Sequence, residues 1–365
     1  MNRDFSHYNE KSNMLITGGS GFIGSNFIHY LFQNSAFTGN VINVDKLTYA
    51  GNPENLMNIR GKFLNTRYFF EMVDICNFQH LEEVFSKFNP DVVVHFAAES
   101  HVDRSIHEPA TFIQTNIIGT FNLLELAKKY QIINKKDILF HHVSTDEVFG
   151  SLGESGFFKE TSPYDPRSPY SASKASSDHL VRSYYHTYNL PVTISNCSNN
   201  YGPYQFPEKL VPLMIYNMLE KKPLPIYGDG KNVRDWLFVE DHCSGIWKII
   251  TTGNIGETYN IGGNNERTNI ELVKILCEKM ALLKDKNKDH YKKLITYVKD
   301  RPGHDRRYAI DCKKIKNELK WKHAVEFQEG IERTVKWYLE NLKWVDNIKS
   351  GEYQNWINKN YSDRT

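Results

Sequence analysis

The most constraining feature of this chain is a cluster of glycines close to its first residues. Residues 17–24 read TGGSGFIG and satisfy both the G-x-G-x-x-G and the G-x-x-G-x-x-G spacings. A β-rich run at 14–17 precedes the cluster, and a helical pattern follows at 22–32. Glycine is needed in such a turn because a Cβ atom would collide with a pyrophosphate lying on the backbone, where the amide groups of the next helix attract it. The segment therefore predicts a dinucleotide-binding strand, turn and helix.

A carboxylate stands where this unit would meet the ribose of the dinucleotide. Residues 41–45 (VINVD) form a second β-rich run that ends at Asp45. The required separation from the last glycine is about 20 residues, which Asp45 satisfies. An acid at this position accepts hydrogen bonds from the ribose hydroxyls and repels a 2′-phosphate. We therefore expect NAD, rather than NADP, as the cofactor.

The first half of the chain alternates between two hydrophobic periods. The β-rich runs are 14–17, 41–45, 68–73, 92–96, 138–144 and 192–196, and the helical patterns are 22–32, 81–88, 110–129 and 170–188. Such alternation predicts a parallel sheet covered on both faces. After Asn199, prolines and glycines become frequent and the helical patterns weaken. We therefore expect an α/β fold, a Rossmann-type doubly wound parallel sheet with a smaller α+β C-terminal substrate lobe.

The length and the patterns also suggest how the chain is divided. Its 365 residues exceed what one compact core usually holds. We expect a polar N-terminal extension at 1–13, a NAD-binding Rossmann domain with the catalytic residues at 14–198, a second lobe at 199–345 and a C-terminal tail at 346–365.

Composition and charge argue against several kinds of partner. The net charge is only +2, which gives no electrostatic reason to expect nucleic acid or an anionic membrane. The five cysteines are scattered and form no C-x-x-C pair, and the histidine spacings fit no metal-ligand set. No stretch approaches the roughly 20 apolar residues that span a bilayer, and residues 1–13 do not resemble a secretory signal. We expect a soluble, cytoplasmic protein without a metal.

A tyrosine and a lysine, Tyr170 and Lys174, stand four residues apart in a helical segment and so share one face, one turn apart. A free tyrosine has a pKa near 10, so service as a base at pH 7 needs a fall of about 3 units. A neighbouring ammonium and a positive nicotinamide ring are natural sources of that fall. Behind a dinucleotide unit, and after a strand ending at Thr145, the pair predicts an oxidoreductase site.

The glycine spacing together with Tyr170 and Lys174 resembles the extended short-chain dehydrogenase/reductase family. The resemblance implies that Tyr170 is the base, that Lys174 lowers its pKa and holds the nicotinamide ribose, and that Thr145 orients the substrate hydroxyl.

Two acids, Asp146 and Glu147, follow Thr145 directly. Unpaired carboxylates near a negatively charged substrate oppose its binding, so a pair of them calls for a chemical reason. An acid and a base side by side suit a reaction that both donates and removes a proton. Dehydration is such a reaction: after oxidation at carbon 4, Glu147 would remove the carbon 5 proton while Asp146 protonates the departing carbon 6 hydroxyl, and the hydride then returns to carbon 6.

Longer strings narrow the resemblance to one branch, the dTDP-glucose 4,6-dehydratases. They are STDEVFG (144–150), AAESHVDRS (97–105), NNYGPYQFPEKL (199–210) and RPGHDRRY (301–308). The resemblance implies an NAD-dependent hydro-lyase of deoxysugar (rhamnose-type) biosynthesis and assigns the second lobe mainly to the sugar nucleotide. Phe149 and Asn196 depart from the pattern, which has Tyr and Arg at these positions.

The resemblance also assigns binding residues by position. The expected cofactor contacts are Gly18, Gly21, Phe22, Ile23, Gly24, Asp45, Lys46, Leu47, Thr48, Asp74, Ile75, Ala97, Ala98, Ser100, Thr115, Tyr170, Lys174 and Asn200. The expected substrate contacts are Ser100, Thr145, Asn199, Lys209, Leu210, Pro225, Ile226, Tyr227, Arg234, Asn269, Arg301 and His304. Arginines suit a diphosphate because their planar guanidinium groups are permanently charged.

Alternatives remain for both the nucleotide and the reaction. Uridine lacks one methyl group of thymidine, worth only about 1–3 kcal/mol in a pocket, so a UDP-glucose 4,6-dehydratase is the first alternative. A sugar-nucleotide 4-epimerase or a decarboxylase would keep Tyr170 and Lys174 without needing the acid pair, and a non-catalytic NAD-binding protein would need none of these residues. The resemblance further implies a homodimer that pairs through helices 110–129 and 170–188.

Overall fold

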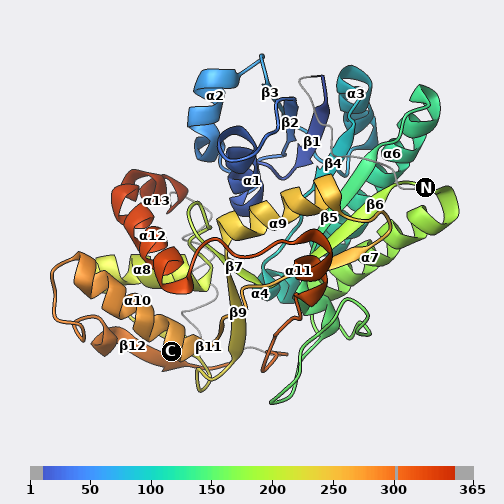
Figure 1. The fold of residues 1–365 in the computed structure, drawn as a ribbon. Coiled ribbons are helices and arrows are strands. Elements are labelled where there is room, and N and C mark those ends of the chain that lie inside the picture. The colour runs from blue at the N-terminus through green and yellow to red at the C-terminus, as the bar shows by residue number, and fades with distance from the viewer. Residues whose placement is uncertain (1–10, 301–302, 350–365) are drawn as a thin grey trace.

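The computed structural model describes residues 11–300 and 303–349. Its centre is a seven-stranded sheet in which all neighbouring strands are parallel (Figure 1). The strand order is β3 (Tyr68–Glu71), β2 (Asn40–Val44), β1 (Asn13–Thr17), β4 (Val92–His95), β5 (Leu139–Thr145), β6 (Val192–Cys197) and β10 (Thr258–Ile261). The chain winds outward from β1 to β3 and returns to β4 on the other side of β1. The doubly wound α/β fold expected from the sequence is confirmed.

Helices cover both faces of this sheet. One face packs on α1 (Phe22–Gln33), α9 (Val239–Thr252) and α11 (Lys313–Leu319), and the other on α3 (Phe78–Phe88), α6 (Thr120–Asn134) and α7 (Pro169–Tyr188). Side chains of β1 alternate between the two layers, since Met14 and Ile16 enter the first core and Leu15 the second. Among the described residues, no helix combines the length and the apolar composition that a membrane crossing requires.

The seventh strand was not foreseen from the sequence. β10 has four buried residues and pairs with β6, although it follows that strand by some sixty positions of chain that include α9. The sequence patterns had ended the sheet at residue 196. So short a strand gives little periodic signal, which is why it escaped prediction.

The smaller lobe has its own core. Its strands form a three-stranded sheet of β7 (Asn199–Tyr201), β9 (Val233–Phe238) and β11 (Glu266–Thr268), and a parallel pair of β8 (Leu224–Tyr227) and β12 (Ile295–Val298). Its helices are α8 (Leu210–Glu220), α10 (Asn269–Leu283), α12 (Phe327–Glu340) and α13 (Leu342–Lys349). Apolar side chains from these helices and strands form one buried cluster. The lobe is thus a second packed unit beside the large sheet (Figure 1).

The expected helix at 110–129 is divided into three parts. It comprises α5 (Pro109–Phe112), a π-helical segment, η2 (Ile113–Gly119), and α6. Within η2, the Asn116 side chain accepts the Glu99 N–H at 2.9 Å and donates to the Ser173 hydroxyl at 2.8 Å. The π segment therefore directs a buried amide toward the cleft-lining residue Glu99 and toward α7, a use that π-bulges commonly have near functional sites.

Several short elements had no prediction. They are η1 (Pro53–Leu56), α2 (Met57–Phe63), α4 (Val102–His107), η3 (Asp146–Phe149), η4 (Lys292–Leu294) and, in the second half, α11, α13 and the strands β7, β8, β9, β11 and β12. Segments of this length contain one or two turns, too few for a helical period to be recognised.

The large sheet and the three-stranded sheet approach each other closely at one glycine, which provides a test of this packing. Gly263 follows β10, and a Cβ there would lie 1.9 Å from the Trp236 carbonyl oxygen of β9. Gly263→Ala should therefore lower the free energy of unfolding by about 3 kcal/mol, as overpacking does. Gly61→Ala is the control, because a Cβ in the middle of α2 meets nothing within 4 Å, and it should stabilise by about 0.5–1 kcal/mol. Urea denaturation would measure both, and equal effects would contradict the described contact.

Candidate active site

The glycine-rich turn between β1 and α1 has the geometry of an anion cradle. Gly18 has φ +70°, and a Cβ on it would lie 2.6 Å from the Ala97 nitrogen. A Cβ on Gly24 would lie 2.3 Å from the Gly18 carbonyl oxygen. Gly21, the N-cap residue of α1, provides no side-chain cap for the helix amides. Because glycine is sterically required and the helix amides lack a side-chain cap, the turn fits the pyrophosphate of a dinucleotide.

Asp45 follows β2 and braces this turn. Its carboxylate accepts the Ser20 N–H at 2.9 Å and the Leu47 N–H at 2.8 Å. Burial raises the pKa of Asp45, while these two backbone hydrogen bonds and Lys46 act in the opposite direction. The acid that was expected at the ribose therefore also fixes the backbone of the glycine-rich turn.

A cleft of about 300 Å³ lies along the carboxyl edge of the sheet. All five expected catalytic residues line it, as do Asn199 and Lys209 of the expected substrate set. The expected cofactor contacts that line it are Gly18, Gly21, Phe22, Ile23, Gly24, Asp45, Lys46, Thr48, Asp74, Ile75, Ala97, Ala98, Ser100, Thr115, Tyr170, Lys174 and Asn200. Leu47 does not line it and contributes its backbone N–H to Asp45 instead. The structure thus brings the expected catalytic residues and the expected cofactor contacts together in one cleft.

Thr145 and the two acids occupy the end of β5. Thr145 is the last residue of the strand, and its hydroxyl accepts the Glu147 N–H at 3.3 Å, which caps the short helix η3. Asp146 is buried, and its Oδ2 atom has no hydrogen-bond partner among the described residues. Burial, followed by the charges of Glu147 and Asp235, raises the pKa of Asp146 well above its ordinary value. The raised pKa favours the protonated form of Asp146, which stands beside the half-buried Glu147.

Tyr170 and Lys174 lie in the first turns of α7. A reciprocal capping box of Ser168 and Ser171 starts this helix. Burial and the charge of Glu147 raise the pKa of Tyr170 well above its ordinary value, and a hydrogen bond with Thr145 lowers it. Burial also lowers the pKa of Lys174 to about 8. Burial and the neighbouring acids therefore disfavour the Tyr170 phenolate, and the role expected of Lys174 stays a prediction.

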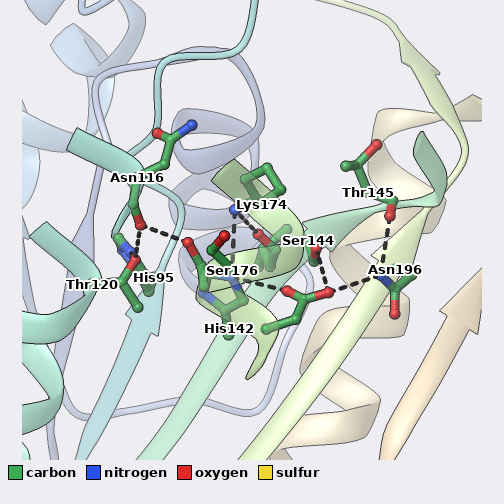
Figure 2. Close-up of polar contacts among 12 residues, drawn as sticks. His95, Asn116, Thr120, His142, Ser144, Thr145, Lys174, Ser176 and Asn196 are labelled. Atoms are coloured by element: carbon green, nitrogen blue, oxygen red, sulfur yellow. Dashed lines mark hydrogen bonds and ion pairs between the residues drawn. The ribbon is translucent and has the colours of Figure 1, made fainter. Parts of the chain in front are cut away.

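The Lys174 ammonium is engaged elsewhere. It donates to the Val143 carbonyl oxygen at 2.9 Å and lies 3.4 Å from His142 Nε2 (Figure 2). The same His142 atom is 3.3 Å from the carboxylate of Asp178, one turn further along α7. Lys174 is thus held by strand β5 while it lines the cleft, and no hydrogen bond to Tyr170 is found within the described part of the chain.

Asp178 is a buried carboxylate that sequence reasoning missed. It accepts hydrogen bonds from the Ser144 hydroxyl at 3.0 Å and the Tyr164 hydroxyl at 2.7 Å. Burial would raise its pKa, but the hydrogen bond and charge of His142 and the charge of Lys174 outweigh burial and hold the pKa low. Asn196, which departs from the expected arginine, donates to the Thr145 carbonyl oxygen at 3.0 Å (Figure 2). These contacts fix the end of β5 from below, and a helical aspartate carries no motif that could have revealed them.

The remaining expected substrate residues belong to the second lobe and do not line the cleft. They are Leu210, Pro225, Ile226, Tyr227, Arg234, Asn269 and His304, and Arg301 lies outside the described residues. The side chain of Ile226 is fully buried in the core of that lobe. Tyr227 donates to the Asp103 carboxylate at 3.2 Å, and Lys209 donates to the Ser100 carbonyl oxygen at 3.0 Å. The roles of this set stay predictions.

Arg234 connects the second lobe to the acid pair. Its guanidinium donates to the Asp305 carbonyl oxygen at 2.9 Å and lies 4.3 Å from the centre of the Tyr308 ring. It is almost fully buried, and its charge lowers the pKa of Asp146 in opposition to burial. The substrate role expected of Arg234 stays a prediction, since the described structure shows this cation buried behind the cleft lining.

Sequence reasoning also missed a second buried acid, Glu208, which lines the cleft. Glu208 lies 3.4 Å from the Arg104 guanidinium and 4.0 Å from His101, both on or beside α4. Burial raises the pKa of Glu208 to about 7, although Lys209 and Arg104 act in the opposite direction. Its position within the string at 199–210 was the only available signal, because an acid so placed in sequence is indistinguishable from a solvated one.

The pKa of Glu208 predicts a pH-dependent stability. Its ordinary pKa near 4.3 applies to the unfolded chain, so the folded state holds the proton more tightly. The stability is full below pH 4.3 and falls as the pH rises toward 7, because ionisation then occurs at a cost in the folded state. Relative to the parent, Glu208→Gln should gain about 2 kcal/mol of unfolding free energy between pH 5 and pH 8.

Urea denaturation at the two pH values would measure this gain. The exposed Glu83→Gln on α3 is the control and should show no such gain. A Glu208→Gln difference that is the same at pH 5 and pH 8 would contradict the raised pKa.

The chain is similar in sequence to characterised enzymes over nearly its whole length. A sequence profile of the family described as GDP-mannose 4,6 dehydratase matches residues 15–334. The dTDP-glucose 4,6-dehydratase of Salmonella typhimurium is 53% identical over 364 residues, covering 96% of this chain and 99% of that protein.

Solved structures agree with the fold. The dTDP-glucose 4,6-dehydratase of Bacillus anthracis in complex with NAD is 49% identical with a TM-score of 0.81, over 93% of this chain and 100% of that one. The dTDP-glucose 4,6-dehydratase of Streptomyces venezuelae with NAD and TYD bound is 44% identical with a TM-score of 0.84, over 92% and 100% of the two chains.

Proposed function

We propose that this chain, which belongs to the nucleotide-sugar 4,6-dehydratase family, is an NAD-dependent hydro-lyase that converts dTDP-glucose into dTDP-4-keto-6-deoxyglucose and water in deoxysugar (rhamnose-type) biosynthesis. The observation that carries this proposal is the acid pair at the end of β5. Asp146 is buried with a raised pKa, and Glu147 beside it lines the same cleft as Tyr170. A protonated acid and an adjacent carboxylate are what elimination of water requires.

The first step is oxidation at carbon 4. Tyr170 takes the proton of the carbon 4 hydroxyl, and Thr145, which lines the same cleft, orients that hydroxyl. When bound, NAD⁺ supplies the hydride acceptor for carbon 4, a positive charge that favours the Tyr170 phenolate, and the hydride that later returns to carbon 6. Gly18, Gly24, Asp45 and Lys174 would hold it.

The second step is the loss of water. The new carbonyl group at carbon 4 acidifies the carbon 5 proton, which Glu147 removes. Asp146 donates its proton to the carbon 6 hydroxyl, which leaves as water. Return of the hydride to carbon 6 and of a proton to carbon 5 completes the product, so the overall change is the loss of one water from the sugar nucleotide.

One assay separates this proposal from its rivals. Purified protein is incubated with NAD⁺ and either dTDP-glucose or UDP-glucose, and the product is examined by mass spectrometry. Loss of one water supports a dehydratase, a product of unchanged mass with galactose configuration supports the 4-epimerase, and unchanged substrate supports a non-catalytic protein. We expect dTDP-glucose to react with the higher kcat/KM. Preference for UDP-glucose would reassign the nucleotide without changing the chemistry.

The double variant Asp146→Asn with Glu147→Gln should separate oxidation from elimination. It keeps Tyr170, so reduced nicotinamide should appear in a single turnover with dTDP-glucose, while the rate of water loss falls by roughly 10²–10⁴-fold, the usual contribution of acid–base groups. Tyr170→Phe is the matched control and should form no reduced nicotinamide. Dehydration by the double variant at the parental rate would remove the role assigned to the pair.

We propose further that the protein is a homodimer that pairs through η2, α6 and α7. Supporting this, Ile113, Ile118 and Phe121 are 52%, 39% and 41% exposed on the outer surface of η2 and α6. Large apolar side chains gathered on exposed turns are characteristic of protein interfaces. Helices α6 and α7 lie beside each other on the same face of the sheet, so a two-fold axis there would bring four helices together.

Phe121→Glu should therefore convert the dimer to a monomer in sedimentation equilibrium, because a charge would be buried at its centre. Met57→Glu provides the control, since Met57 is 65% exposed on α2, far in sequence from these helices, and should leave the mass unchanged. A Phe121→Glu protein that sediments as the parent does would place the interface elsewhere.

A cytoplasmic location is also proposed. All five cysteines are unpaired thiols in the described structure, and four of them are buried. Unpaired cysteines of this kind are typical of a reducing compartment.

A further inference from the structure

The last helix of the second lobe is linked by hydrogen bonds to the glycine-rich turn of the first lobe. Helix α13, drawn in red in Figure 1, contacts η1 of the first lobe. The Trp344 indole donates to the Asn55 side-chain oxygen at 2.7 Å, and the Asn55 amide nitrogen donates to the Ser20 carbonyl oxygen at 2.9 Å. Trp344, Asn55 and Ser20 are 7%, 2% and 1% exposed, so both hydrogen bonds are shielded from water. The first of them joins residues 289 positions apart in sequence, and the second joins residues 35 positions apart.

The backbone of Ser20 is fixed on both sides of its Cα atom. Its N–H donates to Asp45 at 2.9 Å, and its carbonyl oxygen accepts from Asn55 and from the Asn52 N–H, also at 2.9 Å. Ser20 stands between Gly19 and Gly21 in the turn that lines the cleft. The orientation of these two peptide groups therefore determines the shape of the turn on which a pyrophosphate would lie.

The chemistry of tryptophan determines which way Asn55 points. An asparagine side chain can present either its oxygen or its nitrogen to a neighbour, but an indole N–H is only a donor. With Trp344 opposite, the Asn55 oxygen must face α13, and the amide nitrogen must then face Ser20. Removing the indole N–H removes this preference and leaves a buried oxygen without a partner.

Other contacts hold helix α1 of the first lobe to the second lobe. Asn26 on α1 donates to the Pro203 carbonyl oxygen at 3.0 Å, and the His29 ring stacks on Tyr204 at 5.5 Å. Tyr204 packs in turn against Trp337 at 4.7 Å and Trp344 at 6.1 Å. The link through Asn55 is thus part of a packed junction between the lobes.

We propose that Asn55 is a positioning residue for the dinucleotide and that Trp344 orients it, so that the state of α13 controls the affinity for NAD. This inference rests on the dinucleotide binding proposed above and is independent of the dehydration chemistry. By linkage, occupancy of the cofactor site also stabilises α13 to the same extent.

The test is NAD binding by calorimetry on the full chain, after removal of any copurified nucleotide. Trp344→Phe keeps the ring and removes the N–H, and its Kd for NAD should rise by about fivefold or more, the lower end of typical couplings. Trp337→Phe is the matched control, an equivalent change in the same aromatic cluster without a bond to Asn55, and its Kd should stay within about twofold of the parent. An unchanged Kd in Trp344→Phe would overturn the inference.

A double-mutant cycle identifies the route of the coupling. If Trp344 acts through Asn55, adding Trp344→Phe to Asn55→Ala should weaken NAD binding no further than Asn55→Ala alone, whereas additive losses would refute the route. As a second readout, saturating NAD should slow amide exchange in α13 of the parent and leave it unaltered in Trp344→Phe. A parent that binds no NAD would instead refute the proposed function, which separates the two failures.

Discussion

The parallel arrangement of the central sheet is the constraint on which the whole site depends. Because neighbouring strands run in the same direction, the carboxyl ends of β1, β2, β5 and β6 meet at one edge. Each end supplies a different function there: the glycine-rich turn after β1, Asp45 after β2, Thr145 at the end of β5 and Asn199 beyond β6. Residues more than a hundred positions apart thus come to line one cleft without any long-range motif to specify it.

Burial of the residues at the end of β5 then determines the protonation chemistry of the site. The same burial that raises the pKa of Asp146 also raises the pKa of Tyr170, so one environment favours a protonated acid and opposes a deprotonated base. The two needs are reconciled if the positive charge that favours phenolate arrives with the oxidised cofactor, while the proton on Asp146 is held by the protein alone. Asp178 contacts Ser144 and His142 in the layer beneath the cleft, and neither Asp178 nor His142 lines the cleft itself.

Sequence reasoning succeeded where a local pattern dictates a local structure. The strand and helix around Gly18–Gly24, the acid Asp45 and the triplet Thr145–Glu147 are all where expected, because short spacings fix backbone and face. It failed where contacts join distant segments: the edge strand β10, the buried Asp178, and the raised pKa of Glu208 depend on what surrounds a residue in space. The hydrogen bond from the Lys174 ammonium to Val143 was missed for the same reason, since helical spacing to Tyr170 does not reveal it.

Transfer of a label within the sugar tests most directly that one site oxidises carbon 4, eliminates water and returns the same hydride. dTDP-glucose carrying deuterium at carbon 4 would be converted in ordinary water and the product examined by NMR. We expect a 4-keto-6-deoxy product with the deuterium on carbon 6. Deuterium retained at carbon 4 of a galactose-configured product, or lost from the sugar altogether, would contradict the assignment of Asp146 and Glu147 as a dehydrating pair.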